Sequence, residues 1–72
     1  MNREEALNLK PGQILYHKFN KNADGTRQRW KVNGRVRTWK RDLNRIEIPV
    51  KHGLYSYDTI TQHDLEIVDI SP

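Results

Sequence analysis

A chain of 72 residues carries enough apolar side chains for one small hydrophobic core, so we expect a single domain. It is 35% hydrophobic and 31% charged, with 13 lysines and arginines against 9 acids, and it contains no cysteine. These values exclude a disulfide framework, a thiolate metal site and an apolar run long enough to span a membrane, and the segment MNREEALNLK lacks the apolar stretch of a secretory signal. We therefore expect a cytoplasmic protein, and a chain this small favours a binding module over an enzyme.

The N-terminal residues predict one short helix, and the rest of the chain predicts strands. A helix over residues 2–9 is stopped by Pro11-Gly12. Short runs with alternating apolar residues follow, separated by turn residues such as Asn22-Ala23-Asp24-Gly25. The five expected strands cover residues 13–19, 26–32, 35–40, 45–50 and 66–70, and residues 53–59 continue or pair with the fourth.

Strands this short and this numerous predict an all-β fold. A single flat sheet would leave one face and both edges exposed, which is unfavourable for a chain of this size. We therefore expect a small five-stranded barrel, closed or half-open, over residues 10–70. Residues 1–9 form a short N-terminal segment of the same domain.

The dipeptide Asn33-Gly34 is the strongest short signal for a β-hairpin and predicts one at the centre of the barrel. A two-residue turn would place Val36 on the face opposite Trp30 and Val32. A three-residue loop, Val32-Asn33-Gly34, keeps all three apolar side chains on one face. Because burial selects the register that keeps the apolar set together, the sequence predicts the three-residue loop.

This register predicts a strongly basic face on the other side of the hairpin. Residues 27–45 contain eight basic residues and one acid, a formal charge of +7, whereas residues 52–72 contain four acids and no lysine or arginine. Clustered arginines favour bidentate contacts to phosphates, and an exposed tryptophan among them favours stacking on a base. The sequence therefore predicts a nucleic-acid-binding face formed by Arg27, Arg29, Lys31, Arg35, Arg37, Trp39 and Arg41.

Other interpretations of these residues stay open. The same face is also suited to docking on an acidic protein, or it is a solvated surface on which arginine stems cover apolar groups. Trp39 either offers a free ring or lies over the barrel end beneath the guanidinium of Arg37 or Arg41. A second candidate site is an aromatic groove formed by Tyr16, Tyr55 and Tyr57, whose rings otherwise pack with only their hydroxyls in water.

The clearest core strand is the alternating run Ile46, Ile48 and Val50. The side chains expected to face outward from it are those of Arg45, Glu47, Pro49 and Lys51. Since proline has no N–H to donate, this strand is expected to be an edge strand or to be bulged at Pro49. The expected core is completed by Trp30, Leu9, Ile14, Tyr16, Ile60, Leu65, either Ile67 or Val68, and Ile70.

The residue pattern indicates neither an active site nor a cofactor-binding site. His17, His52 and His63 are scattered without a metal-ligand spacing, and neither serine has a His or Asp context for nucleophilic catalysis. Asp58 and Asp64 beside a histidine are only a weak candidate for a metal site. We therefore expect a non-enzymatic protein without a cofactor or metal, which is a monomer or a weak homodimer.

The stretches LKPGQILYH, RWKVNGRVRTWKRD and PVKHGLY resemble small uncharacterised proteins encoded by tailed phages and prophages. The entry Leu-x-Pro-Gly, the central hairpin and the turn Thr-x-x-Asp-Leu before the last strand also resemble SH3-like barrels. The first resemblance implies expression in a bacterial host cytoplasm, and under the alternative function the acidic partner would be a host or virion protein. Neither resemblance implies particular site residues, because SH3-like barrels serve many functions.

Overall fold

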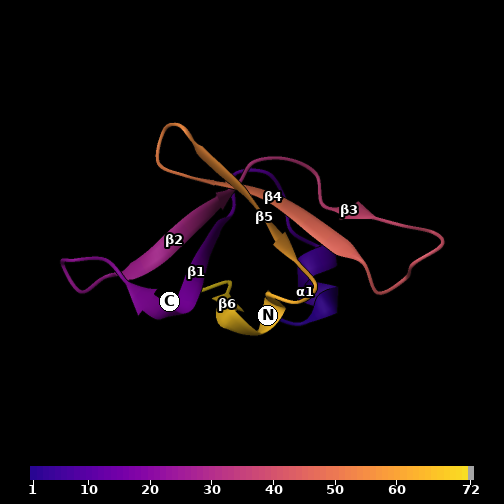
Figure 1. The fold of residues 1–72 in the computed structure, drawn as a ribbon, viewed down its shortest axis with the longest axis horizontal. Helices are drawn as coiled ribbons and strands as arrows, with labels where there is room; N and C mark the ends of the chain where they lie inside the picture. The colour runs from indigo at the N-terminus through magenta and orange to yellow at the C-terminus, as the bar shows by residue number, and fades with distance from the viewer. Residues whose placement is uncertain (72) are drawn as a thin grey trace.

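The computed structural model describes residues 1–71, which form an all-β fold preceded by one short helix (Figure 1). Within these residues the elements are α1 (Arg3–Leu7), β1 (Ile14–Lys21), β2 (Arg27–Val32), β3 (Arg37–Thr38), β4 (Ile46–His52), β5 (Ser56–Thr61), the 3₁₀ turn η1 (Leu65–Ile67) and β6 (Val68–Asp69). The antiparallel sheet has the order β3-β4-β2-β1-β6, and β5 also pairs with β4. The expected all-β class is confirmed.

The helix α1 is short because only one turn is capped and the chain then reaches Pro11. The Asn2 side chain accepts from the Glu5 N–H, and the Glu5 carboxylate accepts from the Asn2 N–H, which forms a capping box. The Met1 amino group donates to the carbonyls of Leu65 and Val68, at 2.9 and 2.7 Å, and so joins the first residue to the last turn. Within residues 1–71, no helix has the length and apolar character needed to cross a membrane.

The predicted hairpin at Asn33-Gly34 is wrong, because β2 and β3 do not pair with each other. The end of β2 pairs with the end of β4, and β3 pairs with the beginning of β4. Since β5 pairs with β4 along nearly its whole length, β2 and β3 must share the opposite edge of β4. They are two parts of one interrupted strand. A tight Asn-Gly hairpin needs a positive φ, and neither Asn33 nor Gly34 has one.

Pro49 lies opposite the interruption and explains it. The N–H of Asn33 donates to the Pro49 carbonyl at 2.8 Å, so the proline nitrogen faces the same edge and has no hydrogen to donate. A Cβ on Gly34 would lie 3.2 Å from Cγ of Pro49, so glycine lets the chain pass close to the ring. The prediction that the strand carrying Pro49 is an edge strand or is bulged at this residue is therefore wrong, because β4 is a continuous inner strand and the irregularity lies in the segment that faces Pro49.

The interruption leaves the alternation of the side chains intact. From Val32 to Arg37 the chain advances five residues, while the facing stretch of β4, from Glu47 to Val50, advances three. Two extra residues preserve the period-two alternation. Val32 is therefore buried, Val36 packs against the core, and Arg37 is exposed. The expected separation of the valines from the cations is confirmed, though not in a hairpin.

The hairpins of the fold lie elsewhere. β1 and β2 are joined through residues 22–26, where Gly25 has a φ of +87°, and β4 and β5 through residues 53–55, where Gly53 has a φ of +77°. The strands β3 and β4 are joined by the longer loop 39–45. Figure 1 shows the β1–β2 pair and the β4–β5 pair spreading from the point where β2 meets β4, with α1 and β6 in the space between them.

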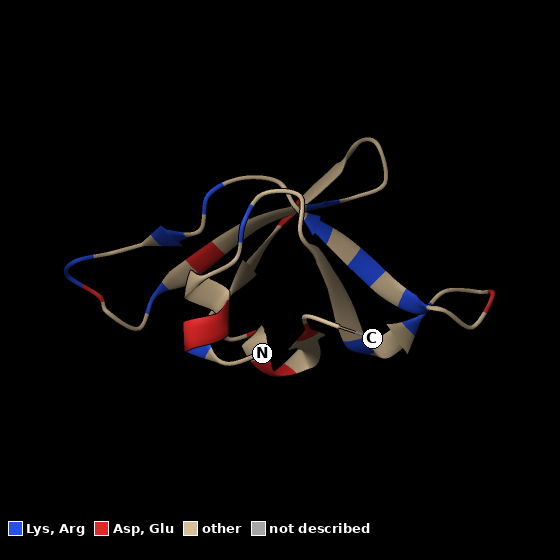
Figure 2. Ribbon diagram, turned by 180° about the vertical axis from the view of Figure 1, so that it is seen from behind, with Lys and Arg blue, Asp and Glu red and all other residues tan. Residues whose placement is uncertain are grey.

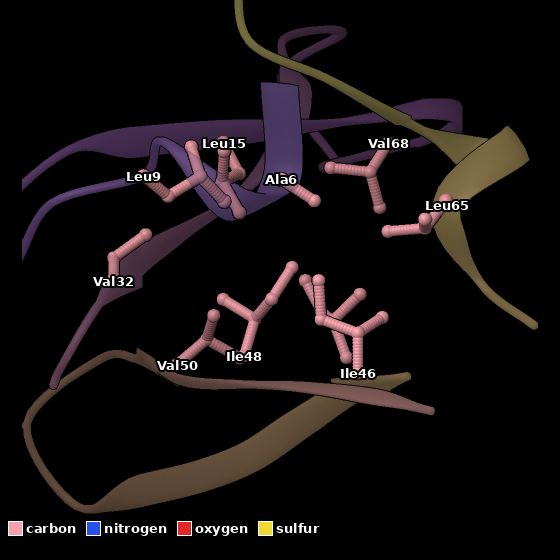
Figure 3. Close-up of a cluster of buried hydrophobic side chains, with 10 residues drawn as sticks. Ala6, Leu9, Leu15, Val32, Ile46, Ile48, Val50, Leu65 and Val68 are labelled. Carbon is pink, nitrogen blue, oxygen red and sulfur yellow. The ribbon is translucent and has the colours of Figure 1, made fainter. Parts of the chain in front are cut away.

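The core lies between these two pairs of strands. Figure 3 shows Ile46, Ile48 and Val50 of β4 pointing toward side chains from α1, β1 and the last turn. Burial of this strand confirms the prediction from its alternating sequence. The buried hydrophobic residues among those described are Ala6, Leu9, Leu15, Val32, Ile46, Ile48, Val50, Ile60, Leu65 and Val68, with Trp30, Ile67 and Ile70 packed against them.

The prediction that Ile14 and Tyr16 of β1 belong to the core is wrong, because the opposite face of this strand is buried. Leu15 and His17 point inward, whereas Ile14 is exposed and Tyr16 is half-buried on the outer face. Burial of His17 is tolerated because its Nδ1 accepts hydrogen bonds from the N–H groups of Phe19 and Asn20, at 3.0 and 2.8 Å.

Candidate functional site

The outer face of the sheet brings together cations from two strands that are distant in sequence. Arg29 and Lys31 alternate with less exposed residues along β2, and both are exposed. Figure 2 shows blue bands alternating with tan along this strand. Lys31 lies directly opposite Lys51 of β4. Directly opposed residues in an antiparallel pair lie on the same face with their Cβ atoms about 5 Å apart. Two lysines are therefore side by side at the centre of this face.

A surface depression of about 560 Å³ lies over these residues. It is open to solvent, and no carboxylate is found among its lining residues in the described part of the chain. Its sides come from the middle of β2, the beginning of β1 and the end of β4 with the following turn. The lining residues are Ile14, Asn22, Gln28, Arg29, Trp30, Lys31, Lys51, His52 and Gly53.

A second depression, of about 520 Å³, adjoins the first through Arg29 and lies toward the β1–β2 loop. Tyr16 lines it and is the direct cross-strand neighbour of Arg29. Asp24 lines it too, and this carboxylate accepts from the Thr26 hydroxyl at 2.6 Å and from the Thr26 N–H at 3.0 Å. These hydrogen bonds lower the pKa of Asp24 and keep it ionised. The positive surface therefore ends at this loop.

Arg27, predicted to contact phosphate, is instead half-buried and paired with other groups of the protein. Its guanidinium forms an ion pair with Asp69 of β6, and its Nε donates to the His17 carbonyl at 2.9 Å. The guanidinium also lies 5.9 Å from the Tyr16 ring centroid. The hydrogen bond from Arg27 lowers the pKa of the Asp69 carboxyl, and the charges of Arg27 and Lys18 act in the same direction. Arg27 therefore joins β2 to the last strand.

Arg35 and Arg37 are exposed but belong to a less uniform part of the face. Arg37 is directly opposite Glu47 in the sheet. The Glu47 carboxylate accepts a hydrogen bond from Arg45, at 3.4 Å. Arg35 lies in the segment between β2 and β3. Within residues 1–71, neither Arg35 nor Arg37 forms an ion pair, so both remain available to a ligand.

Trp39 and Arg41 lie apart from the cations of β2. Both are in the loop 39–45, and the beginning of β4 is about 17 Å along the strand from Lys51. The Arg45 guanidinium lies 4.0 Å from the Trp39 ring centroid, and Trp39 is half-buried. This cation–π contact was expected as an alternative, but with a different arginine. One face of the indole is therefore covered.

The three tyrosines of the predicted groove are spread across the sheet. Tyr16 is on β1, Tyr57 is on β5 opposite Lys51, and Tyr55 is at the tip of the turn between β4 and β5. Two strands separate Tyr16 from Tyr57, which is about 14 Å at the usual strand spacing. Tyr55 and Tyr57 are 89% and 66% exposed, so their rings are free to stack.

Sequence reasoning did not place Lys51 and His52 in the site, although it predicted that Lys51 faces outward. The only signal in the sequence was the outward alternation of Glu47, Pro49 and Lys51. That signal became useful only once the pairing of β2 with β4 was known, because the predicted hairpin had assigned this edge of β2 to β3.

Histidines and acids are the side chains of this chain that could hold a metal ion. Among residues 1–71, no three of them are arranged to do so. His17 is buried, His52 ends β4, and His63 lies in the turn after β5. No protein-family model, curated protein or solved structure matches this chain.

Proposed function

We propose that this protein is a non-enzymatic nucleic-acid-binding module whose interface is the outer face of β2 and β4. The observation that carries the proposal is the juxtaposition of Lys31 and Lys51, with Arg29 and His52 beside them, in a depression without a lining carboxylate. Phosphates are the natural ligands for such a cluster, because each contact releases counterions from the nucleic acid. Arg35 and Arg37 extend the cationic surface along the same edge of β4.

The energetics favour this proposal over a solvated surface. Like charges directly opposite each other in a sheet are destabilising, by about 0.2–1 kcal/mol for a cross-strand pair. A surface with no ligand gains stability when opposite charges alternate, as Arg37 and Glu47 do at the other end of β4. The cluster at Lys31 and Lys51 is unfavourable for the fold and favourable for a polyanion.

We also propose that the fold is a variant of the SH3-like barrel. The support is topological: counting β2 and β3 as one interrupted strand gives five strands in residues 1–71, and the last strand follows a 3₁₀ turn and pairs with β1. A cytoplasmic setting in a bacterial host, as the resemblance to phage proteins implies, belongs to the same proposal and fits a nucleic-acid ligand.

Fluorescence anisotropy with labelled oligonucleotides tests the proposal. We expect binding whose affinity falls steeply with salt, with a log–log slope of about −0.7 for each phosphate contact to a single strand and about −0.9 for each contact to a duplex. Replacing Arg29 and Lys31 together by glutamine should reduce the magnitude of this slope by about 1.4–1.8. Replacing Lys10 and Lys18 together by glutamine removes the same charge outside the depression and serves as the control.

Flat titrations at low salt would contradict the proposal. Equal losses in both double variants would show attraction to net charge instead of a defined interface. If oligonucleotides do not bind but an acidic protein is retained from nuclease-treated lysate, the alternative function as a protein-interaction module is favoured.

A further inference from the structure

We propose that the occupant of this face is a single-stranded nucleic acid that crosses the strands at right angles, with a base stacked on Tyr57 and phosphates at Lys51 and Lys31. This inference rests on the proposed function and specifies the form of its ligand. It also assigns the β4–β5 hairpin, outside the predicted basic face, to the site.

The register of the sheet places these side chains in one row. Ile14 is opposite Lys31, Lys31 is opposite Lys51, and Lys51 is opposite Tyr57. The row therefore crosses β1, β2, β4 and β5, a distance of about 14 Å at the usual strand spacing. It has two cations in the middle and an apolar or aromatic side chain at each end. Ile14 is 37% exposed and Tyr57 is 66% exposed, so both ends are accessible.

This order of groups matches an unpaired strand. A strand with splayed bases presents phosphates and flat base surfaces alternately along its length, and aromatic side chains stack on such bases without regard to sequence. Tyr57 offers its ring next to Lys51, so a nucleotide can contact both at once. The adjoining depression also contains Tyr16 and Arg29, but the ionised Asp24 lines it too, so the strand is assigned to the first depression alone.

A duplex fits the same face poorly. Its bases are stacked inside, and it is usually bound by a helix or ribbon that enters a groove. Here the cations lie in a depression beside the turn 53–55, and Leu54 and Tyr55 at this turn are 78% and 89% exposed. A flexible strand can follow the floor of a depression more closely than a rigid duplex can.

The test compares one labelled oligonucleotide of mixed sequence with the same oligonucleotide annealed to its complement, at equal salt. We expect the single strand to bind about tenfold more tightly, a difference within the range for one base stacked on an aromatic ring. Tyr57→Thr, which keeps the strand preference of the position, should weaken single-strand binding by about 5- to 150-fold. Tyr57→Phe should retain binding because the ring remains. Phe19→Ala is the matched control, since Phe19 is 68% exposed but lines a different depression, with Met1 and Ile67.

The outcomes separate this inference from the proposed function. Equal or tighter binding of the duplex, with a salt slope lost in the double variant of Arg29 and Lys31, would overturn the inference and leave the proposed function standing. Unchanged single-strand affinity in a folded Tyr57→Thr protein would overturn it too, and a circular dichroism melt of each variant establishes folding. If neither form of nucleic acid binds, both the inference and the proposed function fail.

Discussion

Replacing Lys51 by glutamate is expected to stabilise the fold and to weaken nucleic-acid binding at the same time. Lys51 is directly opposite Lys31, so the substitution turns a repulsive cross-strand pair into an attractive one. A cross-strand charge pair changes the free energy of unfolding by about 0.2–1 kcal/mol. The substitution removes one unfavourable pair and adds one favourable pair, so the two changes add. We therefore expect a gain of about 1 kcal/mol, which raises Tm by about 4–8 °C in a domain of this size.

Thermal unfolding at low and high salt, followed by circular dichroism, measures the first effect. The gain should be largest at low ionic strength and should shrink in about 1 M salt, where the Debye length falls to about 3 Å. Anisotropy titrations measure the second effect. Loss of one phosphate contact reduces the salt slope by about 0.7–0.9, and the new carboxylate repels the backbone, so affinity should fall at every salt concentration below that limit.

Lys18→Glu is the control, because it changes the net charge equally but lies in the depression with Met1 and Phe19. It should leave oligonucleotide affinity nearly unchanged. A Lys51→Glu protein that melts at or below the unmodified protein at low salt would refute the electrostatic argument. Unchanged affinity in the same protein would refute the assignment of Lys51 to the interface.

Three further predictions concern the fold. Ile48→Ala, at a fully buried position, should cost about 2–5 kcal/mol in urea unfolding, whereas Ile48→Val should cost about 0.5–1.5 kcal/mol. The folded-state pKa of Asp69 lies below its ordinary value of 3.8, so its ion pair stabilises the fold above that pH and ceases to do so as the pH falls through the lowered pKa. Asp69→Asn should therefore lower Tm at neutral pH, and the Tm of this variant should fall less steeply below about pH 4 than that of the unmodified protein. Arg45→Ala should uncover Trp39, shifting tryptophan emission to longer wavelength and reducing stability by about 0.5–1 kcal/mol, while Arg41→Ala in the same loop should do neither.

The sequence predicted the parts of the fold whose pattern is local. The alternation of Ile46, Ile48 and Val50 has a single apolar face, so the buried side of β4 was unambiguous. In β1 both faces carry large apolar or aromatic side chains, because Ile14 and Tyr16 alternate with Leu15 and His17. The face with Leu15 and His17 is buried, and the His17 Nδ1 there accepts two backbone N–H hydrogen bonds. The alternation of side chains in the sequence does not predict these backbone hydrogen bonds.

The sequence failed where a distant strand competes with a local turn. Asn33-Gly34 predicts a hairpin from its own conformational preference, yet β4 pairs with β2 before the strand and with β3 after it. Glycine is needed here for the close approach to Pro49 and not for a positive φ. Nothing within the stretch itself shows that Pro49 will lie against it.

The proposed interface depends only in part on the wrong prediction of a hairpin at Asn33-Gly34. Alternation alone places Arg29 and Lys31 on the outer face, whatever strand lies beside β2, so half of the cluster follows from local sequence. The other half, Lys51, comes from a strand twenty residues further along the chain. It lies opposite Lys31 because the chain does not turn back after β2, so that β2 and β3 both pair with the same edge of β4 on either side of the interruption at Pro49. A repulsive pair assembled from distant segments is not explained by a local run of basic residues, and it is the arrangement that a bound phosphate would relieve.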